Sequence, residues 1–541
     1  MKALFWSDEM NTQEIRQKIE NYETSLGIEL GSTRIKVVLI DDEFKVIAAG
    51  ESEWENELNA DGFWTYSENI IWSKLQEAYA NLLANVKREF ECIPTGYGAV
   101  GFSAMMHGYI ALDKSGKLLV PFRTWRNGNT DQATKELSKL FNFNIPHRWS
   151  IAHLHQAILN KESHLTEIDQ ITTLAGYVHW KLTGEKVLGV GDASGMFPID
   201  SKTNQYNQEM IDQYNDLVAS GNYPWKVEEI LPNVLLAGEN AGTLTEQGAT
   251  LLDPTGSLKP GIPMAPPEGD AGTGMVATDS IKKGTANVSA GTSAFAMVVL
   301  DKELSKVYPE IDIVTTPAGA EVAMVHINNC TSEINYWMSL FKETFDTMGI
   351  EVSMNELYEK LFNKSLEADQ DIGQLLVYGF HSGENIINVE QGRPMIVRNP
   401  NGKFNLANFI KANLYSAFAV MKIGMDTLLE KENIEISETV AHGGIFKTPV
   451  IAQSVLAAVM KSSVTVMDTA SEGGAWGMAI LASYIRSNNR LSLEDYLDTQ
   501  VFKDVQSSTV EPTAENISHY EFYIDQFVSA IELSQDAHRF L

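Results

Sequence analysis

The 541-residue sequence has only two cysteines, Cys92 and Cys330, and no uninterrupted run of about 18 apolar residues. Two cysteines cannot build a disulfide framework or a cysteine-based zinc site, so a reducing compartment fits this composition. The missing apolar run argues against a membrane-spanning helix. Residues 1–24 lack the apolar core of a signal peptide and predict a short helical extension. We therefore expect a cytoplasmic protein without a membrane partner.

Basic residues are also scarce. The 41 Lys and Arg residues stand against 71 Asp and Glu, which gives a formal charge of −30. Broad binding to nucleic acid or to anionic membranes needs a basic surface, so we expect neither as a partner. A phosphorylated small molecule remains compatible with this charge, provided that backbone amides and a cation hold it in a local pocket.

The length exceeds what one hydrophobic core serves, so two large domains are expected. Alternating strand-like and helical patterns predict an α/β fold with a boundary near residue 280. We expect an extension over 1–24, a first domain over 25–280, a second over 281–490 and a helical tail over 491–541. Strand-like runs lie at 26–31, 35–40, 45–50 and 97–103, and helical patterns at 66–89, 151–161, 404–430 and 448–461.

One short pattern occurs twice. The stretch "LGIELGSTRIKVVLID", residues 26–41, reads as strand, turn and strand, and "TANVSAGTSAFAMVVL", residues 285–300, repeats this order. A hairpin needs only Gly or Asn to turn, whereas these turns carry Gly, Ser and Thr together. Amides and hydroxyls in such a turn suit a bound anion. The repeat predicts two related domains with a phosphate-facing hairpin each, although two polar turns alike by chance remain an alternative.

A third feature is Asp270, which stands in "EGDAGTG". Glycines on both sides would allow a ligand to approach, and a carboxylate there could take a proton from a hydroxyl nucleophile. The plainer reading is a loop aspartate that caps a turn. We discount "GTGMVA", residues 272–277, as a dinucleotide fingerprint because no clean strand precedes it. His153 and His155 form a pair that we interpret as packed or solvent-facing rather than metal-binding.

Small residues dominate two later segments. Gly443 and Gly444 follow a short apolar strand and are expected to open a helix, which would place amides at its positive end. "EGGAWG", residues 472–477, precedes another helix rich in small residues. Such residues admit a planar ring between elements, and they equally permit close packing of helices.

These motifs together, in this order over residues 25–485, resemble the FGGY carbohydrate kinases. The resemblance implies a two-domain actin/hexokinase-like (ribonuclease H-like) α/β fold with the active site in the interdomain cleft. "SAMMHGYIALDKSGKLLVPFRTWRN", residues 103–127, looks most like the xylulokinase branch, in which a Met-His-Gly sits in the sugar site. The implied activity is ATP-dependent phosphorylation of a terminal hydroxyl of a ketopentose, with D-xylulose favoured and L-ribulose next.

The resemblance also implies roles for individual residues. Asp270 would be the general base and would touch the sugar, and Glu29 would hold Mg2+ through water beside the ATP. The expected sugar contacts are Met106, His107, Trp125 and Asn127. The expected nucleotide contacts are Gly31, Ser32, Thr33 and Lys36 in the first domain, and Gly291, Thr292, Gly443, Gly444 and Gln453 in the second.

The sequence departs from the family pattern around the substrate. Glu29 replaces the usual aspartate of the first strand, and Ala271 stands where relatives often have Asn or Gln. The Pro-Lys signature is missing, with His153 roughly in place of the lysine. An actin-like ATPase that acts on a protein partner would share the hairpins without needing His107 or Asp270. A homodimer is compatible with the sequence.

Overall fold

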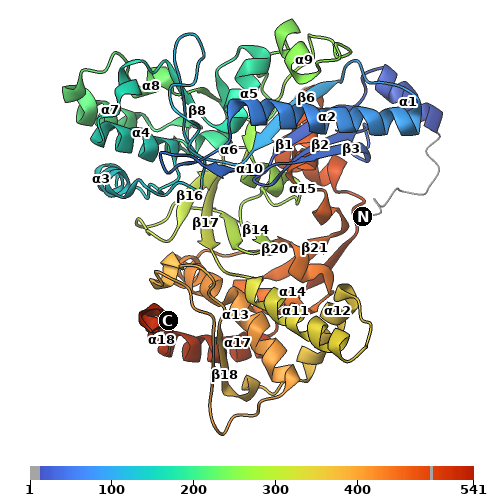
Figure 1. Ribbon diagram of the computed structural model, residues 1–541, viewed down its shortest axis with the longest axis vertical. Coiled ribbons are helices and arrows are strands. Elements are labelled where there is room, and N and C mark those ends of the chain that lie inside the picture. Colours follow the sequence, from blue (N-terminus) through green and yellow to red (C-terminus); the bar gives the residue numbers. More distant parts are fainter. Residues whose placement is uncertain (1–11, 488–490, 541) are drawn as a thin grey trace. The chain divides into compact units, whose positions relative to one another are not determined.

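The computed structural model describes residues 12–487 and 491–540 (Figure 1). Its chain divides into two compact units, each made of several separate segments. Unit 1 takes residues up to 281, then 314–321 and 472–504, and unit 2 takes 282–313, 322–471 and 505–541. Of the expected N-terminal extension, Thr12–Glu20 forms helix α1, and residues 1–11 lie outside the described residues.

The sheet of unit 1 has five strands in the order β13-β6-β1-β2-β3. The first three strands along the chain form an antiparallel meander, and β6 and β13 run parallel to β1. The predicted strands at 26–31, 35–40, 45–50 and 97–103 are thereby confirmed. Their bounds are β1 (Ser25–Leu30), β2 (Arg34–Ile40), β3 (Val46–Glu53), β6 (Ala99–Ala104) and β13 (Glu268–Gly269).

Two glycines let helices approach both faces of this sheet. Gly50 is in register with Ile28, the neighbour of Gly27, so the two glycines face opposite sides. A Cβ on Gly27 would lie 2.0 Å from the carbonyl oxygen of Ala475 in helix α15 (Gly473–Tyr484). A Cβ on Gly50 would lie 2.3 Å from a carbonyl of helix α2 (Glu68–Phe90). The small residues of "EGGAWG" therefore serve close packing of α15 onto the sheet.

The remaining elements of unit 1 lie outside this five-stranded sheet. Predicted helices at 66–89 and 151–161 correspond to α2 and α4, and both are confirmed. Residues 272–277 lie in and just after helix α10, so they form no dinucleotide-binding turn. The other helices are α3 (Asp131–Phe141), α4 (Ser150–Leu159), α5 (Leu174–Thr183), α6 (Val190–Ala193), α7 (Gln208–Val218), α8 (Val227–Ile230), α9 (Glu246–Leu252), α10 (Asp270–Val276) and α16 (Leu493–Tyr496). The short paired strands are β4 (Glu57–Leu58) with β5 (Trp64–Thr65), β7 (Ile110–Leu112) with β8 (Gln170–Thr172), β9 (Val187–Gly189) with β12 (Asn233–Leu235), and β10 (Ile199–Asp200) with β11 (Gln205–Tyr206).

The second sheet has seven strands in the order β16-β17-β15-β14-β20-β21-β22, and most of its residues belong to unit 2. The predicted helices at 404–430 and 448–461 are confirmed as α13 and α14. The strands are β14 (Thr285–Ala290), β15 (Ala294–Val299), β16 (Asp312–Thr315), β17 (Glu321–Ile327), β20 (Glu438–His442), β21 (Ser463–Met467) and β22 (Ser507–Val510), with a separate hairpin of β18 (Leu375–Tyr378) and β19 (Met395–Arg398). The helices are α11 (Ser332–Thr347), α12 (Met354–Lys364), α13 (Leu406–Asp426), α14 (Ile451–Met460), α17 (Ala514–Ser529) and α18 (Glu532–Asp536).

The repeat seen in the sequence is a repeat in structure. In each sheet an antiparallel hairpin, β1–β2 or β14–β15, pairs on its first strand with a parallel strand, β6 or β20. The turns fall at Gly31–Thr33 and Gly291–Ser293, as predicted. The C-terminal segment is not purely helical, because β22 pairs with β21 as the last strand of the second sheet.

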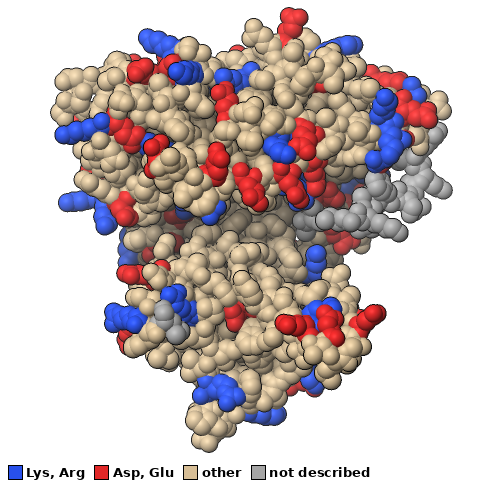
Figure 2. All heavy atoms as spheres, in the orientation of Figure 1, with Lys and Arg blue, Asp and Glu red and all other residues tan. Residues whose placement is uncertain are grey.

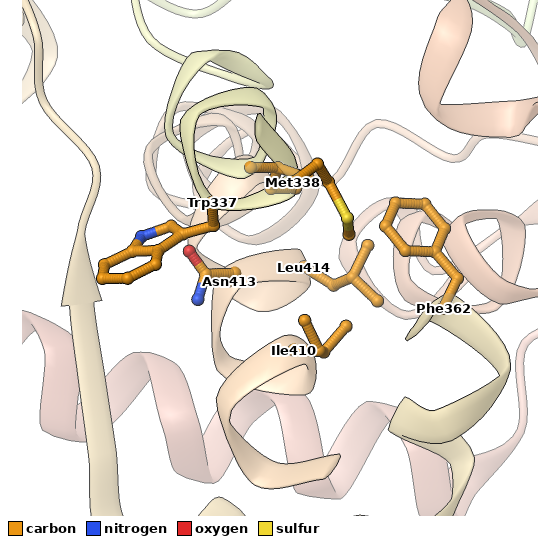
Figure 3. Close-up of a pocket in the computed structure, with 7 residues that line it drawn as sticks. Trp337, Met338, Phe362, Ile410, Asn413 and Leu414 are labelled. Atoms are coloured by element: carbon orange, nitrogen blue, oxygen red, sulfur yellow. The ribbon is translucent and has the colours of Figure 1, made fainter. Parts of the chain in front are cut away.

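Apolar side chains converge in unit 2 between α11, α12 and α13. Figure 3 shows Met338, Phe362 and Leu414 pointing toward one another in this space. The Asn413 amide beside them donates to the carbonyl of Phe409 at 2.9 Å. A ligand site combines apolar walls with several convergent polar groups, and this lining is almost wholly apolar. We therefore treat it as part of the core.

Acidic and basic side chains are interspersed on the face shown in Figure 2. Among the described residues, no helix combines the length and the apolar character that crossing a bilayer requires.

Candidate active site

In the turn of the first hairpin, Gly31–Thr33, all three carbonyl groups accept hydrogen bonds from other residues of unit 1. The Trp54 indole donates to the carbonyl of Gly31 at 2.7 Å, and the Tyr66 hydroxyl donates to that of Ser32 at 2.6 Å. The amide of Trp54 donates to the carbonyl of Thr33 at 3.1 Å, and the Trp54 and Tyr66 rings stack with centroids 4.2 Å apart. Both hydroxyl residues of the turn are exposed. Their amides and hydroxyls therefore stay available to an anion.

The second hairpin turn, in unit 2, is held in the same way. The amide and hydroxyl of Thr331 donate to the carbonyl of Gly291 at 3.1 and 2.8 Å. The amide of Cys330 donates to the carbonyl of Thr292 at 2.8 Å. Gly291 and Thr292 are exposed. The amides of Gly31 and Gly291 close their turns by donating to the carbonyls of Arg34 and Ser293 at 3.0 and 2.9 Å. The hydroxyl-bearing residues of each turn still offer donors, which is the polarity that a phosphate needs.

Asp270 is the first residue of helix α10, directly after β13. The sequence suggested a loop at this position, so that expectation is wrong. Its Oδ1 accepts a hydrogen bond from the amide of Met106 at 3.2 Å. Burial raises the pKa of Asp270 to about 6, although backbone hydrogen bonds act in the opposite direction. A carboxylate with such a pKa is ionised near neutral pH and accepts a proton more readily than an exposed one.

His107 follows Met106 in a strained turn. Its φ of +68° is uncommon for a residue with a side chain, and the imidazole is buried. Nδ1 lies 3.2 Å from the carbonyl oxygen of Gly195, and burial holds the pKa of His107 well below its usual range. A carbonyl can only accept, so Nδ1 carries the proton of the neutral ring and Nε2 is left as an acceptor. Nε2 of His107 is therefore a neutral acceptor, and His107 directly follows Met106, whose amide donates to Asp270.

The other two expected sugar contacts differ from each other. Trp125 is 40% exposed and lies at the surface of unit 1. Asn127 is buried, with Oδ1 accepting from the amide of Trp64 at 2.8 Å and Nδ2 donating to the carbonyls of Trp64 and Thr124 at 2.8 and 3.0 Å. The side-chain amide of Asn127 is already bonded to the backbone of Trp64 and Thr124, so a sugar would have to displace one of these hydrogen bonds.

Glu29 and Lys36 face each other across β1 and β2, and both reach the start of α15. Oε2 of Glu29 accepts from the amide of Ala475 at 3.1 Å, and Nζ of Lys36 donates to the carbonyl of Glu472 at 2.8 Å. Lys36 is thus bonded to the backbone rather than pointing free toward a phosphate. Burial and the charge of Asp270 raise the pKa of Glu29 to about 7.

A metal would find two carboxylates here. In the part of the chain that the structure describes, no three His, Cys, Asp or Glu side chains gather as a metal site. Mg2+ commonly needs only one or two carboxylates beside substrate phosphates and water. The charge of Asp270 raises the pKa of Glu29, and a cation would offset that repulsion. These residues therefore fit a water-bridged Mg2+ in company with a nucleotide.

The glycine pair in unit 2 needs a correction. Gly443 has a φ of +126°, and a Cβ there would lie 2.0 Å from the carbonyl oxygen of Ala290, so only glycine fits beside the second hairpin. A short 3-10 turn from Gly444 to Lys447 follows, and helix α14 begins only at Ile451. The sequence predicted that this pair opens a helix, and that prediction is wrong for α14. Gly444 is exposed and has open space around it.

Gln453 is buried and fully engaged within unit 2. Its Oε1 accepts from the amide of Val450 at 3.0 Å, and Nε2 donates to the carbonyls of Ser508 and Val464 at 2.9 and 3.3 Å. The side chain ties α14 to β21 and β22. A nucleotide contact from Gln453 would require it to leave these partners.

The histidine pair is packed within unit 1. His155 lies 3.1 Å from Glu136, and the ring of His153 lies 6.4 Å from that of Tyr109. Burial lowers the pKa of His153 to about 3, so it carries no charge near neutral pH.

Sequence reasoning did not find the residues behind the two turns. Trp54 lies 23 residues from its partner Gly31, and Tyr66 lies 34 residues from its partner Ser32. Thr331 lies 40 residues from Gly291. No local pattern joins them to the turns. A tryptophan and a tyrosine that flank a short hairpin after the third strand were the only available signal.

Comparisons with known proteins agree with this architecture. Residues 24–277 match the N-terminal domain, and residues 286–485 the C-terminal domain, of the FGGY family of carbohydrate kinases. A xylulose kinase of Haemophilus influenzae is 23% identical over 517 residues, covering 93% of this chain and 98% of that protein. Two solved structures from Lactobacillus acidophilus share the fold, each with a TM-score of 0.76 and 15% identity. One is a ligand-bound xylulose kinase, and the match covers 95% of this chain and 99% of that one. The other is a gluconate kinase, and the match covers 96% of this chain and 99% of that one. The chain belongs to the FGGY family of carbohydrate kinases.

Proposed function

We propose that this carbohydrate kinase transfers the γ-phosphoryl group of ATP to a terminal hydroxyl of a ketopentose, D-xylulose first and L-ribulose second. The observation that carries the proposal is the pairing of Asp270 with the Met106–His107 turn in unit 1. Asp270 would take the hydroxyl proton as the hydroxyl oxygen attacks the γ-phosphorus and ADP leaves. His107 would accept a hydrogen bond from a second sugar hydroxyl.

Each hairpin turn, taken by itself, is proposed to contact a phosphate of the nucleotide. The amides and hydroxyls of Ser32, Thr33 and Thr292 suit the phosphates, whereas the amides of Gly31 and Gly291 close their own turns by donating to Arg34 and Ser293. Gly443 and Gly444 would leave room for the adenosine. Glu29 would hold Mg2+ through water, and the cation would supply charge neutralisation for the transferred group.

A coupled assay of ADP release tests the function. The panel should contain D-xylulose, L-ribulose and their stereoisomers, with glycerol and gluconate as comparison substrates. We expect turnover with D-xylulose above that with every other compound. ATP hydrolysis that is the same with and without sugar would contradict the proposal and favour an actin-like ATPase that acts on a protein.

The pKa of Asp270 predicts a pH dependence. The base must be ionised, and burial places its pKa at about 6. We expect kcat/KM for the sugar to be level above that pH and to fall about tenfold per unit below it. The measurement is a pH–rate profile from about 5 to 8, accompanied by Tm at each pH so that unfolding is separated from titration. A profile that stays level down to pH 5 would remove Asp270 as the base.

His107→Ala is expected to raise the sugar KM about 10- to 100-fold while ATP binding without sugar stays unchanged, because the sugar loses a positioned acceptor. Both the KM and Tm should be measured. The control is His179→Ala, since His179 is also buried and lies 2.9 Å from a backbone carbonyl, that of Ala241. We expect this control to lower Tm only. If His107→Ala behaves in the same way, His107 is a core residue.

A further inference from the structure

Glu268 is a buried carboxylate that the proposed reaction does not use. It lies at 1% exposure in β13, two residues before Asp270. Its Oε2 accepts from the amide of Asp192 at 3.0 Å, and its Oε1 accepts from the amide of Gly191 at 3.4 Å. Burying an ionisable group is costly, so a carboxyl in this place needs a reason.

The chain makes room for this carboxyl with two glycines in "GVGDASG", residues 189–195. A Cβ on Gly189 would lie 2.1 Å from Oε1 of Glu268, and a Cβ on Gly191 would lie 2.5 Å from Oε2. Any other residue at either position would push the carboxyl away. Helix α6 and the strand that carries Glu268 are therefore fitted to each other.

The far end of the same segment reaches the Met106–His107 turn. The carbonyl of Gly195 holds Nδ1 of His107, and a Cβ on Gly195 would lie 2.5 Å from that nitrogen and 3.1 Å from Cε of Met106. Residues 189–195 thus contact Glu268 at one end and the proposed sugar-binding turn at the other.

Asp192 strengthens the connection in the middle of the segment. Its Oδ2 accepts from the hydroxyl of Thr173 at 2.6 Å. Its Oδ1 is buried without a hydrogen-bond partner and lies 3.4 Å from where a Cβ on Gly269 would stand. Cγ of Met106 lies 2.1 Å from that same point. Asp192 and Met106 therefore both lie against Gly269, the residue that joins Glu268 to Asp270.

We propose that Glu268 is a positioning residue for the sugar: its hydrogen bonds to α6 fix residues 189–195, which in turn orient His107 and Met106 against Asp270. The inference rests on the proposed function. Glu268 acts through the segment and does not touch the reacting atoms. Its loss should loosen the sugar-binding turn and leave the nucleotide turn at Gly31 in place.

The test compares Glu268→Ala with Glu268→Gln in the full-length enzyme. We expect the alanine variant to raise the sugar KM about tenfold or more, with the KM for ATP nearly unchanged. The glutamine variant keeps a carbonyl oxygen for the amide of Asp192 and should restore the KM to within about threefold. Gly191→Ala is a second route, because its methyl group would displace the carboxyl of Glu268 while leaving that residue present.

Asp253→Ala is the matched control. Asp253 is also a buried carboxylate of unit 1 that accepts from backbone amides, those of Ser257 and Leu258 at 3.0 and 2.9 Å. It should lower Tm without changing the sugar KM. If Glu268→Ala and Gly191→Ala likewise change only Tm, the positioning role is overturned.

A readout without substrate separates this inference from the proposed function. Amide hydrogen exchange of residues 103–109 should become faster in Glu268→Ala and Gly191→Ala than in Asp253→Ala. Unchanged exchange in that segment would overturn the inference even in an active kinase. If the wild type phosphorylates none of the sugars while the exchange responds as expected, the proposed function fails and the structural coupling stands.

Discussion

Asp270→Asn is expected to lower kcat about 10²- to 10⁴-fold while the affinities for sugar and ATP stay within a few fold. Asparagine is nearly isosteric and keeps an oxygen for the amide of Met106, so the turn that carries His107 should remain in place. The variant loses only the ability to take the proton of the attacking hydroxyl. Steady-state kinetics give kcat, and equilibrium binding of each substrate gives the affinities.

The control for this variant is Asp41→Asn. Asp41 is buried in unit 1 and caps its own turn through the amides of Glu43 and Lys45, at the end of β2 opposite to the Gly31 turn. It should change Tm and leave kcat as it is. A near-normal kcat in Asp270→Asn would withdraw the assignment of the base.

Gly291→Val should raise the Kd of ATP about 10- to 100-fold, and Gly31→Val should do the same from the other unit. In the proposed function each turn lets a phosphate approach its backbone, and a charge-assisted hydrogen bond lost there would cost about 1.5–3 kcal/mol. At Gly291 a Cβ meets only an ordinary contact, the carbonyl oxygen of Ser293 at 3.7 Å. At Gly31 it would lie 3.1 Å from the carbonyl oxygen of Arg34, so that carbonyl has to shift by a few tenths of an ångström. Gly291→Val should therefore fold like the wild type, and Tm of Gly31→Val shows whether its turn accepts the shift.

Calorimetric titration of ATP and of sugar, each alone, measures the two effects separately. Gly128→Val supplies the comparison, since Gly128 is exposed, has open space around it and needs no special backbone conformation. It should bind ATP like the wild type. A raised sugar Kd with an unchanged ATP Kd in Gly291→Val would reverse the assignment of the turn.

What could be predicted from the sequence was local. The turns at Gly31 and Gly291 were identified because strand, small polar turn and strand follow one another without interruption. Asp270 stood out between two glycines, although its place at the start of α10 did not, because a seven-residue helix of small residues has little amphipathic pattern.

What could not be predicted depends on partners far along the chain. Asn127 and Gln453 are suitable ligands by chemistry, and only the fold shows that their amides are bonded to Trp64 and Ser508. Glu268 gave no signal, because its partners lie 76 and 77 residues earlier. Spacing within a motif cannot report hydrogen bonds of this separation.

The packing of α15 on β1 has a practical consequence for dissecting the molecule. The helix that touches Gly27 comes from residues 473–484, far beyond the first exit of the chain from unit 1 at residue 281. A fragment cut at the sequence boundary of the first domain would leave the face of β1 without its helix and open to solvent. A minimal version of unit 1 would have to graft residues 472–504 back by a linker, as in a circularly permuted gene.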